Sequence, residues 1–338
     1  MNHYNIALIP GDGVGPELIE ATRCVLGTLE QNLGAFTLGF NEYPFGESAY
    51  LSLGEAVPDS TLEGVQNSDA ALLGAVSVRN IPSPSPIGAL RRRLDLYADV
   101  RTVRSWPGAW SLVPDIDIVC VRENTEGFLA DRNLHQGYGE WMPNPDQVMS
   151  LRVVTRQKSE NIARFAFEYA KAHGRKKITA LHKAGVLKLG CGLFLEAVSN
   201  VAREYPEIEF SDEYIDNAAN HIIAAPQDYD IILTTNLFGD IISDVAAALV
   251  SNLVPTANFG TSAVFMPVNH QARTSEAGLG AVNPLPIFVC AGMMLAHLGE
   301  HRSAGIFNTA LCMALERGAL SMRDTKRVTE LVCSGLRT

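Results

Sequence analysis

Short runs rich in β-branched and apolar residues alternate along the chain with longer stretches in which apolar positions recur every three or four residues. The short runs predict strands, and the longer stretches predict helices. The predicted strands are Tyr4–Ile9, Ala70–Leu73, Ile116–Arg122, Ser150–Thr155, Lys177–Leu181, Glu207–Tyr214 and Asp230–Thr234. The predicted helices are Pro16–Asn32, Ser159–His173, Gly192–Tyr205, Ala218–Ala224, Gly239–Leu253, Leu285–Leu298 and Ile306–Arg317.

This alternation predicts an α/β protein in which helices cover a mainly parallel sheet. A length of 338 residues favours two lobes. The composition is that of a globular protein, with 47% hydrophobic and 19% charged residues, and excludes a disordered, coiled-coil or collagen-like chain. The net charge of −10 makes nucleic acid a poor partner, because such a surface repels phosphates.

Neither a membrane span nor a signal peptide is predicted. The apolar stretches are too short or too interrupted to cross a bilayer, and no cationic region precedes the first apolar run. The six cysteines form no CxxC pair and lie mostly among apolar neighbours, which predicts reduced thiols. We therefore expect a cytoplasmic protein without membrane contact.

A glycine-containing loop, Ile9–Glu17, follows the first predicted strand and opens a helix. Its glycines permit tight turns, and a helix N-terminus attracts anions. Pro16 stands where a dinucleotide fingerprint would need its third glycine, so the segment is not a Rossmann motif. It fits a cofactor-lining loop and a plain strand–turn–helix connection equally well.

Two sets of charged residues are candidates for chemistry. Arginines bind carboxylates through two parallel hydrogen bonds, and Arg122 ends an apolar strand where α/β sheets place ligands. Asp240 and Asp244 lie four residues apart on one helix face and, with Asp216, offer the oxygen ligands preferred by Mg²⁺ or Mn²⁺. Aspartates near a helix N-terminus also have a purely structural explanation.

The segment from His297 to His301 matches the HxxEH pattern of some zinc proteases. That pattern requires one uninterrupted helix, and Gly299 stands inside it. We therefore reject a zinc site.

Taken together, these segments resemble the isocitrate/3-isopropylmalate dehydrogenase family of β-decarboxylating dehydrogenases. No single motif is sufficient, but seven occur in the family's order over most of the chain. The matching segments are Ile9–Glu17, Leu90–Arg101, Arg122–Gly127, His182–Gly185, Asn236–Asp244, Asn283–Pro284 and Met293–Leu295.

The resemblance implies a two-domain mixed-sheet α/β fold distinct from Rossmann proteins. Both chain ends, 1–99 and 250–338, would form a large cofactor-side domain, and 100–249 a middle domain that forms a homodimer with shared active sites. The implied substrate is a di- or tricarboxylate-like small molecule. Its implied binding residues are Ser85, Ile87, Arg91, Arg101 and Arg122.

The resemblance also implies the remaining site residues. Asp240 and Asp244 of one subunit, with Asp216 of the other, would hold Mg²⁺ or Mn²⁺, and Lys183 would act on the hydroxyl proton together with Asp216. NAD or NADP would be bound by Ile9, Gly11, His270, Arg273, Ser275, Asn283 and Arg327. We favour NADP, because Ser275 stands where NAD-preferring relatives place an acid and because Arg273, Arg323 and Arg327 offer cations for a 2′-phosphate.

Four positions depart from the family pattern. Leu129 replaces the usual proton-donating tyrosine, for which Tyr138 could substitute, and Gly185 replaces a common asparagine. The loop from His270 to Ser275 is altered, and Ser85 with Ile87 mixes isocitrate-type and isopropylmalate-type residues. We therefore expect a specialised rather than housekeeping dehydrogenase acting on a malate-type 2-hydroxy acid. The alternative is a catalytically weak regulatory or ligand-binding subunit of the same family.

Overall fold

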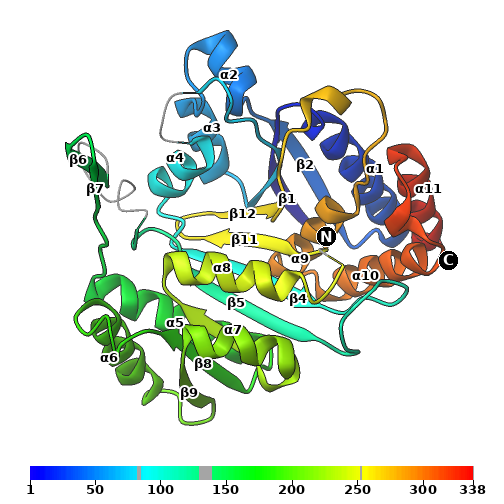
Figure 1. Ribbon diagram of the computed structural model, residues 1–338. Helices are drawn as coiled ribbons and strands as arrows, with labels where there is room; N and C mark the ends of the chain where they lie inside the picture. The colour runs from blue at the N-terminus through cyan, green and yellow to red at the C-terminus, as the bar shows by residue number, and fades with distance from the viewer. Residues whose placement is uncertain (82–84, 129–138, 252, 338) are drawn as a thin grey trace. The chain divides into compact units, whose positions relative to one another are not determined.

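The computed structural model describes residues 1–81, 85–128, 139–251 and 253–337 (Figure 1). The chain divides into two compact units. Unit 1 comprises Met1–Leu94, Trp106–Trp110 and Leu253–Thr338, and unit 2 comprises Asp95–Ser105 and Ser111–Asn252. Each unit combines helices with a mixed sheet, which confirms the predicted fold class.

The sheet of unit 1 has the strand order β2-β1-β3-β12-β11. All neighbours are parallel except the final pair, β12 and β11. The strands are β1 (Asn2–Gly11), β2 (Phe36–Glu42), β3 (Ala70–Ala75), β11 (Pro255–Phe259) and β12 (Ala263–Pro267). β3 is buried along its whole length, as expected for a strand covered on both faces.

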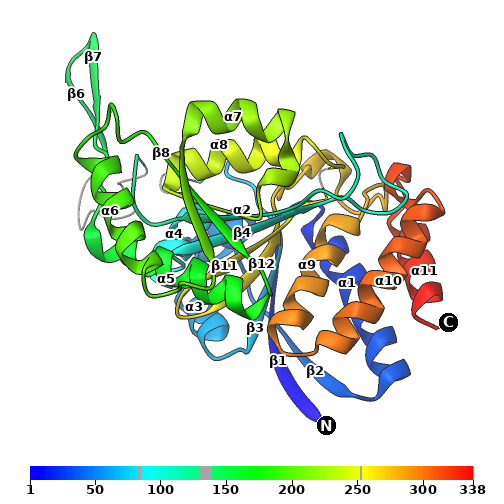
Figure 2. The same ribbon diagram turned by 90° about the horizontal axis from the view of Figure 1, so that it is seen from below.

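Four long helices form one layer of unit 1, and Figure 2 shows them side by side along the strands. They are α1 (Gly15–Leu33), α9 (Leu285–His297), α10 (His301–Glu316) and α11 (Thr325–Leu336). Three shorter helices are α2 (Gly46–Leu53), α3 (Asp59–Gln66) and α4 (Pro86–Arg93), and the single turns are η3 (Thr274–Glu276) and η4 (Ala319–Ser321). The core includes Val25, Phe265, Phe288 and Leu311, which are fully buried.

The sheet of unit 2 has the order β4-β5-β10-β8-β9, antiparallel only between β4 and β5. Its strands are β4 (Ala98–Arg104), β5 (Asp117–Glu123), β8 (Lys177–His182), β9 (Glu209–Tyr214) and β10 (Ile231–Thr234). Its helices are α5 (Arg156–Ala172), α6 (Gly190–Ala202), α7 (Ile215–Ala224) and α8 (Asn236–Ala247), with the turn η2 (Pro226–Asp228). Figure 2 shows α7 and α8 together above these strands.

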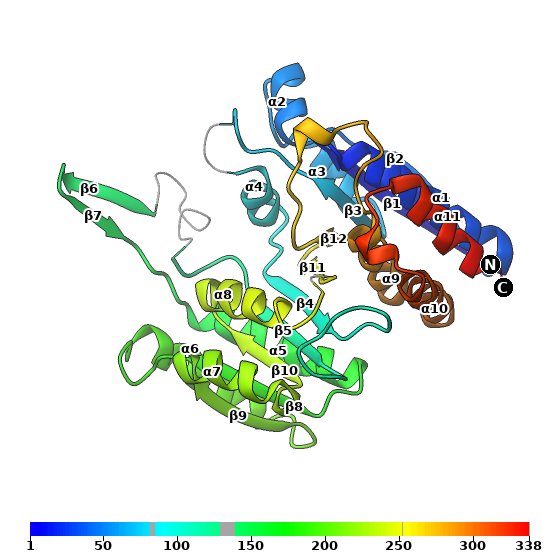
Figure 3. The same cartoon turned by 45° about the vertical axis from the view of Figure 1, so that its right-hand side comes forward.

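A two-stranded hairpin of β6 (Glu140–Asn144) and β7 (Gln147–Ser150) extends from the rest of unit 2 (Figure 3). All residues of both strands are exposed. Because β7 ends at Ser150, the predicted strand Ser150–Thr155 is wrong beyond its first residue. Val153 forms only an isolated bridge with Gly127, and the Thr155 side chain caps α5 by accepting a hydrogen bond from the Lys158 N–H.

Two further sequence features have clear outcomes. Gly299 adopts the left-handed conformation, with φ of 83°, and separates α9 from α10. His297 and His301 thus belong to different helices, and the zinc-protease pattern has no structural basis. All six cysteines are free thiols. Within the described part of the chain, no helix has the length and hydropathy needed to cross a membrane.

Candidate active site

Two neighbouring strands of unit 2 bring three charged residues onto one face of the sheet. Asp99 and Arg101 are two residues apart on β4, so their side chains project from the same face. The antiparallel register places Asp99 directly opposite Arg122 of β5. Helix α8 contributes Asp240, together with Ser243 and Asp244 one turn further along.

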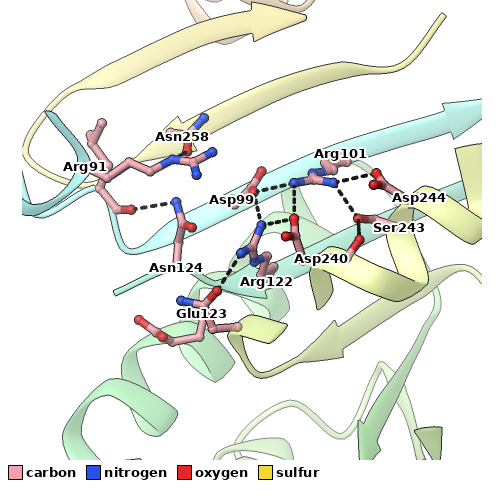
Figure 4. A network of polar contacts seen from close by, with 12 residues as sticks. Arg91, Asp99, Arg101, Arg122, Glu123, Asn124, Asp240, Ser243, Asp244 and Asn258 are labelled. Carbon is pink, nitrogen blue, oxygen red and sulfur yellow. Dashed lines mark hydrogen bonds and ion pairs between the residues drawn. The ribbon is translucent and has the colours of Figure 1, made fainter. Parts of the chain in front are cut away.

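These residues form a continuous network of ion pairs (Figure 4). The Asp99 carboxylate lies 3.3 Å from both guanidinium groups, Arg101 Nη2 and Arg122 Nη1. Asp240 Oδ1 also contacts both arginines, at 2.9 Å from Arg101 and 2.6 Å from Arg122. Asp244 lies 3.1 Å from Arg101 Nη1, which additionally donates to the Ser243 hydroxyl at 2.7 Å.

Burial divides the network into an interior and a rim. Asp99 is fully buried, and the side chains of Arg122 and Arg101 are 3% and 8% exposed. Asp240 and Asp244 are 47% and 67% exposed. The two guanidinium groups therefore lie beneath a pair of carboxylates that solvent and ligands can reach.

The electrostatics of the two arginines differ. Burial by itself lowers the pKa of Arg101, but the charges of Asp99, Asp240 and Asp244 outweigh this effect and raise it above its ordinary value. Burial lowers the pKa of Arg122, with Asp99 and Asp240 opposing the shift only in part. Both guanidinium groups stay charged, because arginine does not deprotonate in proteins.

Local packing fixes this arrangement. A Cβ atom on Gly239 would lie 2.6 Å from the Arg122 side chain, so the glycine allows the first turn of α8 to approach the strand. At the same turn, Asn236 accepts a hydrogen bond from Arg122 Nη2 at 2.5 Å and donates one to the Glu126 carbonyl. The Asn-Leu-Phe-Gly-Asp segment thus supplies both the glycine that allows close packing against Arg122 and the carboxylate that pairs with it.

A divalent cation fits the exposed carboxylates of the rim. Asp240 and Asp244 present hard oxygen donors one helical turn apart, but within the residues that the structure describes no three His, Cys, Asp or Glu side chains converge in one chain. Asp216 instead lies in the first turn of α7 and pairs with the ammonium of Lys183, which directly follows β8.

Lys183 lies among groups that control its position. Its ammonium contacts Asp216 and stands 4.9 Å from the centre of the Tyr214 ring. The hydrogen bond from Lys183 lowers the pKa of the Asp216 carboxyl, so this acid is ionised at neutral pH. A Cβ atom on Gly185 would lie 2.4 Å from the Tyr214 hydroxyl, which occupies the space where a larger residue's side chain would begin.

Three predicted substrate residues belong to unit 1. Arg91 of α4 is 7% exposed and donates from Nε to Asn258 Oδ1 at 2.8 Å. The Ser85 hydroxyl caps the same helix by accepting the Gly88 N–H, and Ile87 is buried. Leu129 and Tyr138, the missing and the substitute proton donor, lie outside the described residues.

The glycine loop owes its shape to an acid that we did not single out from the sequence. Gly11 has φ of 73°, and a Cβ atom there would lie 2.0 Å from the Ala75 carbonyl oxygen. The buried Asp12 carboxylate accepts backbone N–H groups of Glu47, Ser48 and Ser77. The Ile9 side chain is fully buried and contributes to the core.

The other predicted cofactor residues also lie in unit 1. Arg273 and Arg323 both pair with Glu276, at 2.5 and 2.6 Å, while Arg327 is exposed and lies 3.7 Å from Glu330. Ser275 lies in η3, and His270 Nδ1 is 3.3 Å from the Pro267 carbonyl. The Asn283 amide donates to the carbonyls of Ala319, Leu320 and Met322, which ties it to the backbone before α11.

Replacing Arg101 by alanine tests the buried ion pairs. Asp99 would keep Arg122 but lose one of its two cationic partners in a site without solvent. Loss of one partner of a buried pair typically costs about 3–5 kcal/mol, so we expect a decrease of that order in the free energy of unfolding, measured with urea. The control is Arg164→Ala, which removes an exposed pair with Glu204 and should have a much smaller effect. Equal decreases would show that the network contributes nothing beyond a surface pair.

Comparison with known proteins gives a consistent result. The family model described as isocitrate/isopropylmalate dehydrogenase matches residues 5–335. The chain is 42% identical over 316 residues to 3-isopropylmalate dehydrogenase of Archaeoglobus fulgidus, covering 93% of this chain and 92% of that protein. It is 38% identical to isocitrate/homoisocitrate dehydrogenase of Thermus thermophilus, covering 99% of each.

A solved structure agrees with these relatives. The crystal structure of isocitrate dehydrogenase from Methylococcus capsulatus matches with a TM-score of 0.88 and 34% identity, over 99% of this chain and all of that one. Sequence and fold thus support the same assignment over nearly the whole length. The chain belongs to the isocitrate/isopropylmalate dehydrogenase family of NAD(P)-dependent, decarboxylating oxidoreductases.

Proposed function

We propose that the protein oxidises a substituted malate-type 2-hydroxy acid with NAD(P) and Mg²⁺ or Mn²⁺, and that β-decarboxylation follows. The observation that carries this proposal is the pair of buried guanidinium groups beneath two exposed carboxylates. Arginines offer a carboxylate of the substrate parallel hydrogen bonds, and the aspartates offer a cation oxygen ligands. The oxidoreductase activity is inferred from membership of the isocitrate/isopropylmalate dehydrogenase family.

Each side chain has a defined task in this proposal. Arg101 and Arg122 bind and orient a substrate carboxylate, and their ion pairs with Asp99 and Asp240 hold the guanidinium groups in position. Lys183 Nζ, after passing one proton to Asp216 or to solvent, takes up the proton of the substrate hydroxyl, and Asp216 holds the lysine in place. Asp240 and Asp244 would hold the divalent ion, which would supply Lewis acidity, and the bound nicotinamide cofactor would supply the hydride acceptor.

We further propose a homodimer with shared sites, formed through unit 2, while unit 1, built from both chain ends, binds the cofactor. Exposed apolar side chains on described elements of unit 2 support this interface. They include Trp141, Met142 and Val148 of the hairpin, Val186 and Leu189 after β8, Ile223 of α7, and Leu237 and Ile241 of α8. A partner subunit that covers these side chains would remove their apolar surface from water.

The second candidate function is a regulatory or ligand-binding subunit with weak activity. The departures at Leu129 and Gly185 favour it. Lys183, Asp216, Asp240 and Asp244 favour an enzyme, because a binding subunit does not need a complete base and metal set. The departures at Leu129 and Gly185, together with the retained base and metal residues, support an enzyme that acts on an unusual 2-hydroxy acid.

Turnover with a panel of 3-substituted malates tests the function. We expect NAD(P)H formation, followed by absorbance at the nicotinamide band, to require Mg²⁺ or Mn²⁺ and to vanish with chelator. Carbon dioxide measured in the same reaction shows whether decarboxylation is completed. Asp240→Asn should weaken metal binding, measured by calorimetry, while leaving the protein folded. Full turnover in chelator, or no oxidation of any malate with either cofactor, would contradict the proposal.

Mixing two inactive variants tests the shared site. A Lys183→Ala chain and an Asp240→Asn chain each lack one contribution, and a mixed dimer would regain one site with both. We expect partial recovery of activity after the chains are unfolded together and refolded. Mixed dimers isolated by two affinity tags that remain inactive would show that each chain carries a self-contained site.

We propose NADP as the preferred cofactor, with Glu276 limiting the preference. The hydrogen bond from Arg273 lowers the pKa of the Glu276 carboxyl, and Arg323 adds to this effect, so the acid is charged. It competes with a 2′-phosphate for the same two guanidinium groups. The single charge of Glu276 neutralises only one of the two guanidinium charges, so one net positive charge remains to attract a 2′-phosphate.

Glu276→Gln should therefore raise the ratio of kcat/KM for NADP to that for NAD by about tenfold, since one repelling charge is removed. Steady-state kinetics with both cofactors measures the ratio. Glu204→Gln, which removes an exposed acid paired with Arg164 in unit 2, is the matched control. An unchanged ratio in Glu276→Gln, or a wild-type preference for NAD, would contradict the assignment.

A further inference from the structure

His182 is a buried histidine next to Lys183 that no step of the proposed reaction uses. It ends β8, and its side chain is only 3% exposed. The parallel register places it beside Tyr214 of β9, with Asp212 on the same face two residues earlier. The Tyr214 ring meets the imidazole edge to face, with 5.3 Å between ring centres. The imidazole thus lies between a carboxylate and an aromatic ring, one residue before the lysine.

Both ring nitrogens of His182 have hydrogen-bond partners. Nε2 lies 2.9 Å from Asp212 Oδ2, and Nδ1 accepts the backbone N–H of Ala184 at 2.9 Å. Because a backbone N–H can only donate, Nδ1 carries no hydrogen, and the ring hydrogen is on Nε2, where it is donated to the carboxylate. Asp212 therefore favours the one tautomer in which the other ring nitrogen can accept.

The hydrogen bond to Nδ1 fixes the peptide unit that joins Lys183 to Ala184. The N–H of this unit is held by the His182 ring, and its C=O, that of Lys183, accepts the N–H groups of Val186 and Leu187 at 3.1 and 2.8 Å. Both polar groups of the unit thus have partners. Because the unit adjoins the lysine Cα atom, its orientation limits the directions in which the lysine side chain can point.

We propose that His182 and Asp212 form a positioning pair for the base Lys183: Asp212 selects the tautomer of His182, and Nδ1 of His182 orients the peptide unit after the lysine. This inference rests on the proposed function, because it adds two positioning residues to the same reaction. The pair acts through the lysine and needs no contact with the substrate. Its loss therefore lowers the rate of the chemical step, which depends on where Lys183 Nζ stands, and leaves ligand affinity unchanged.

Two replacements of His182 separate this role from a purely structural one. The amide oxygen in His182→Asn reaches about as far as Nδ1 and can still accept the Ala184 N–H, but the contact with Asp212 is lost. The amide in His182→Gln reaches about as far as Nε2 and can still donate to Asp212, but the Ala184 N–H loses its acceptor. If the histidine only ties β8 to β9, His182→Gln is the less damaged variant. If it positions the lysine, His182→Asn is.

Steady-state kinetics with a malate that wild type oxidises measures this order. We expect kcat to fall by about tenfold or more in His182→Gln and by no more than about threefold in His182→Asn. KM for the malate and for the cofactor should stay within about twofold of wild type in both variants. Urea unfolding reports the stability of each variant separately. Equal kcat in the two variants, or the opposite order, would overturn the inference.

Asp212→Ala removes the other member of the pair. Its carboxylate is half-exposed, and we expect its loss to lower kcat by about threefold or more without raising KM, since the ring loses its Nε2 acceptor. Asp228→Ala is the matched control, because Asp228 has the same 50% exposure and lies at the same 2.9 Å from a histidine, His221, but belongs to η2. Its kcat should stay within about twofold of wild type. Equal losses in the two variants would refute a specific role for Asp212.

NMR of wild type with ¹⁵N-labelled histidine tests the tautomer without turnover. His182, assigned by loss of its signals in His182→Asn, should carry a hydrogen on Nε2 and none on Nδ1. A hydrogen on Nδ1 would overturn the inference, and this test holds also where a variant does not fold. Wild type that oxidises no malate with either cofactor would instead refute the proposed function itself.

Discussion

The candidate site depends on keeping two guanidinium groups charged inside a protein sheet. Such burial is costly unless each cation is paired and hydrogen-bonded. Here the compensation comes from within the same layer: Asp99 lies opposite Arg122 and two residues from Arg101, and α8 adds Asp240 above both. The carboxylates thus stabilise the two buried arginines.

This requirement explains the local design of α8. The helix has to approach β5 closely enough for its first turns to reach two buried cations. Gly239 permits that approach, and Asn236 anchors the turn between Arg122 and the Glu126 carbonyl. Larger side chains at these two positions would move Asp240 and Asp244 away from the arginines. A motif that carries the candidate metal ligands is therefore also a packing motif.

In unit 1, polar groups predicted to bind the cofactor mostly have structural partners. Asn283 holds the backbone that leads to α11, and Asp12, which was not among the predicted residues, organises the N-terminal turn of α2. Arg273 and Arg323 share Glu276. These contacts shape the loops before a ligand binds, because each fixes a backbone segment or a side-chain orientation. A ligand at these loops would meet groups that are already oriented.

The sequence by itself determined the family, the α/β class and most elements with a strong apolar pattern, such as β1, β8, α1 and α9. It did not predict β4, because three charged residues in seven give the appearance of a polar loop. Nor did it predict β11 and β12, which are short and have proline at a terminal position. Alternation of Asp99 and Arg101 was visible, but only the antiparallel register with β5 puts Asp99 opposite Arg122. Tertiary structure decided which charges are buried together, because ion pairing depends on distances between strands and helices that are remote in sequence.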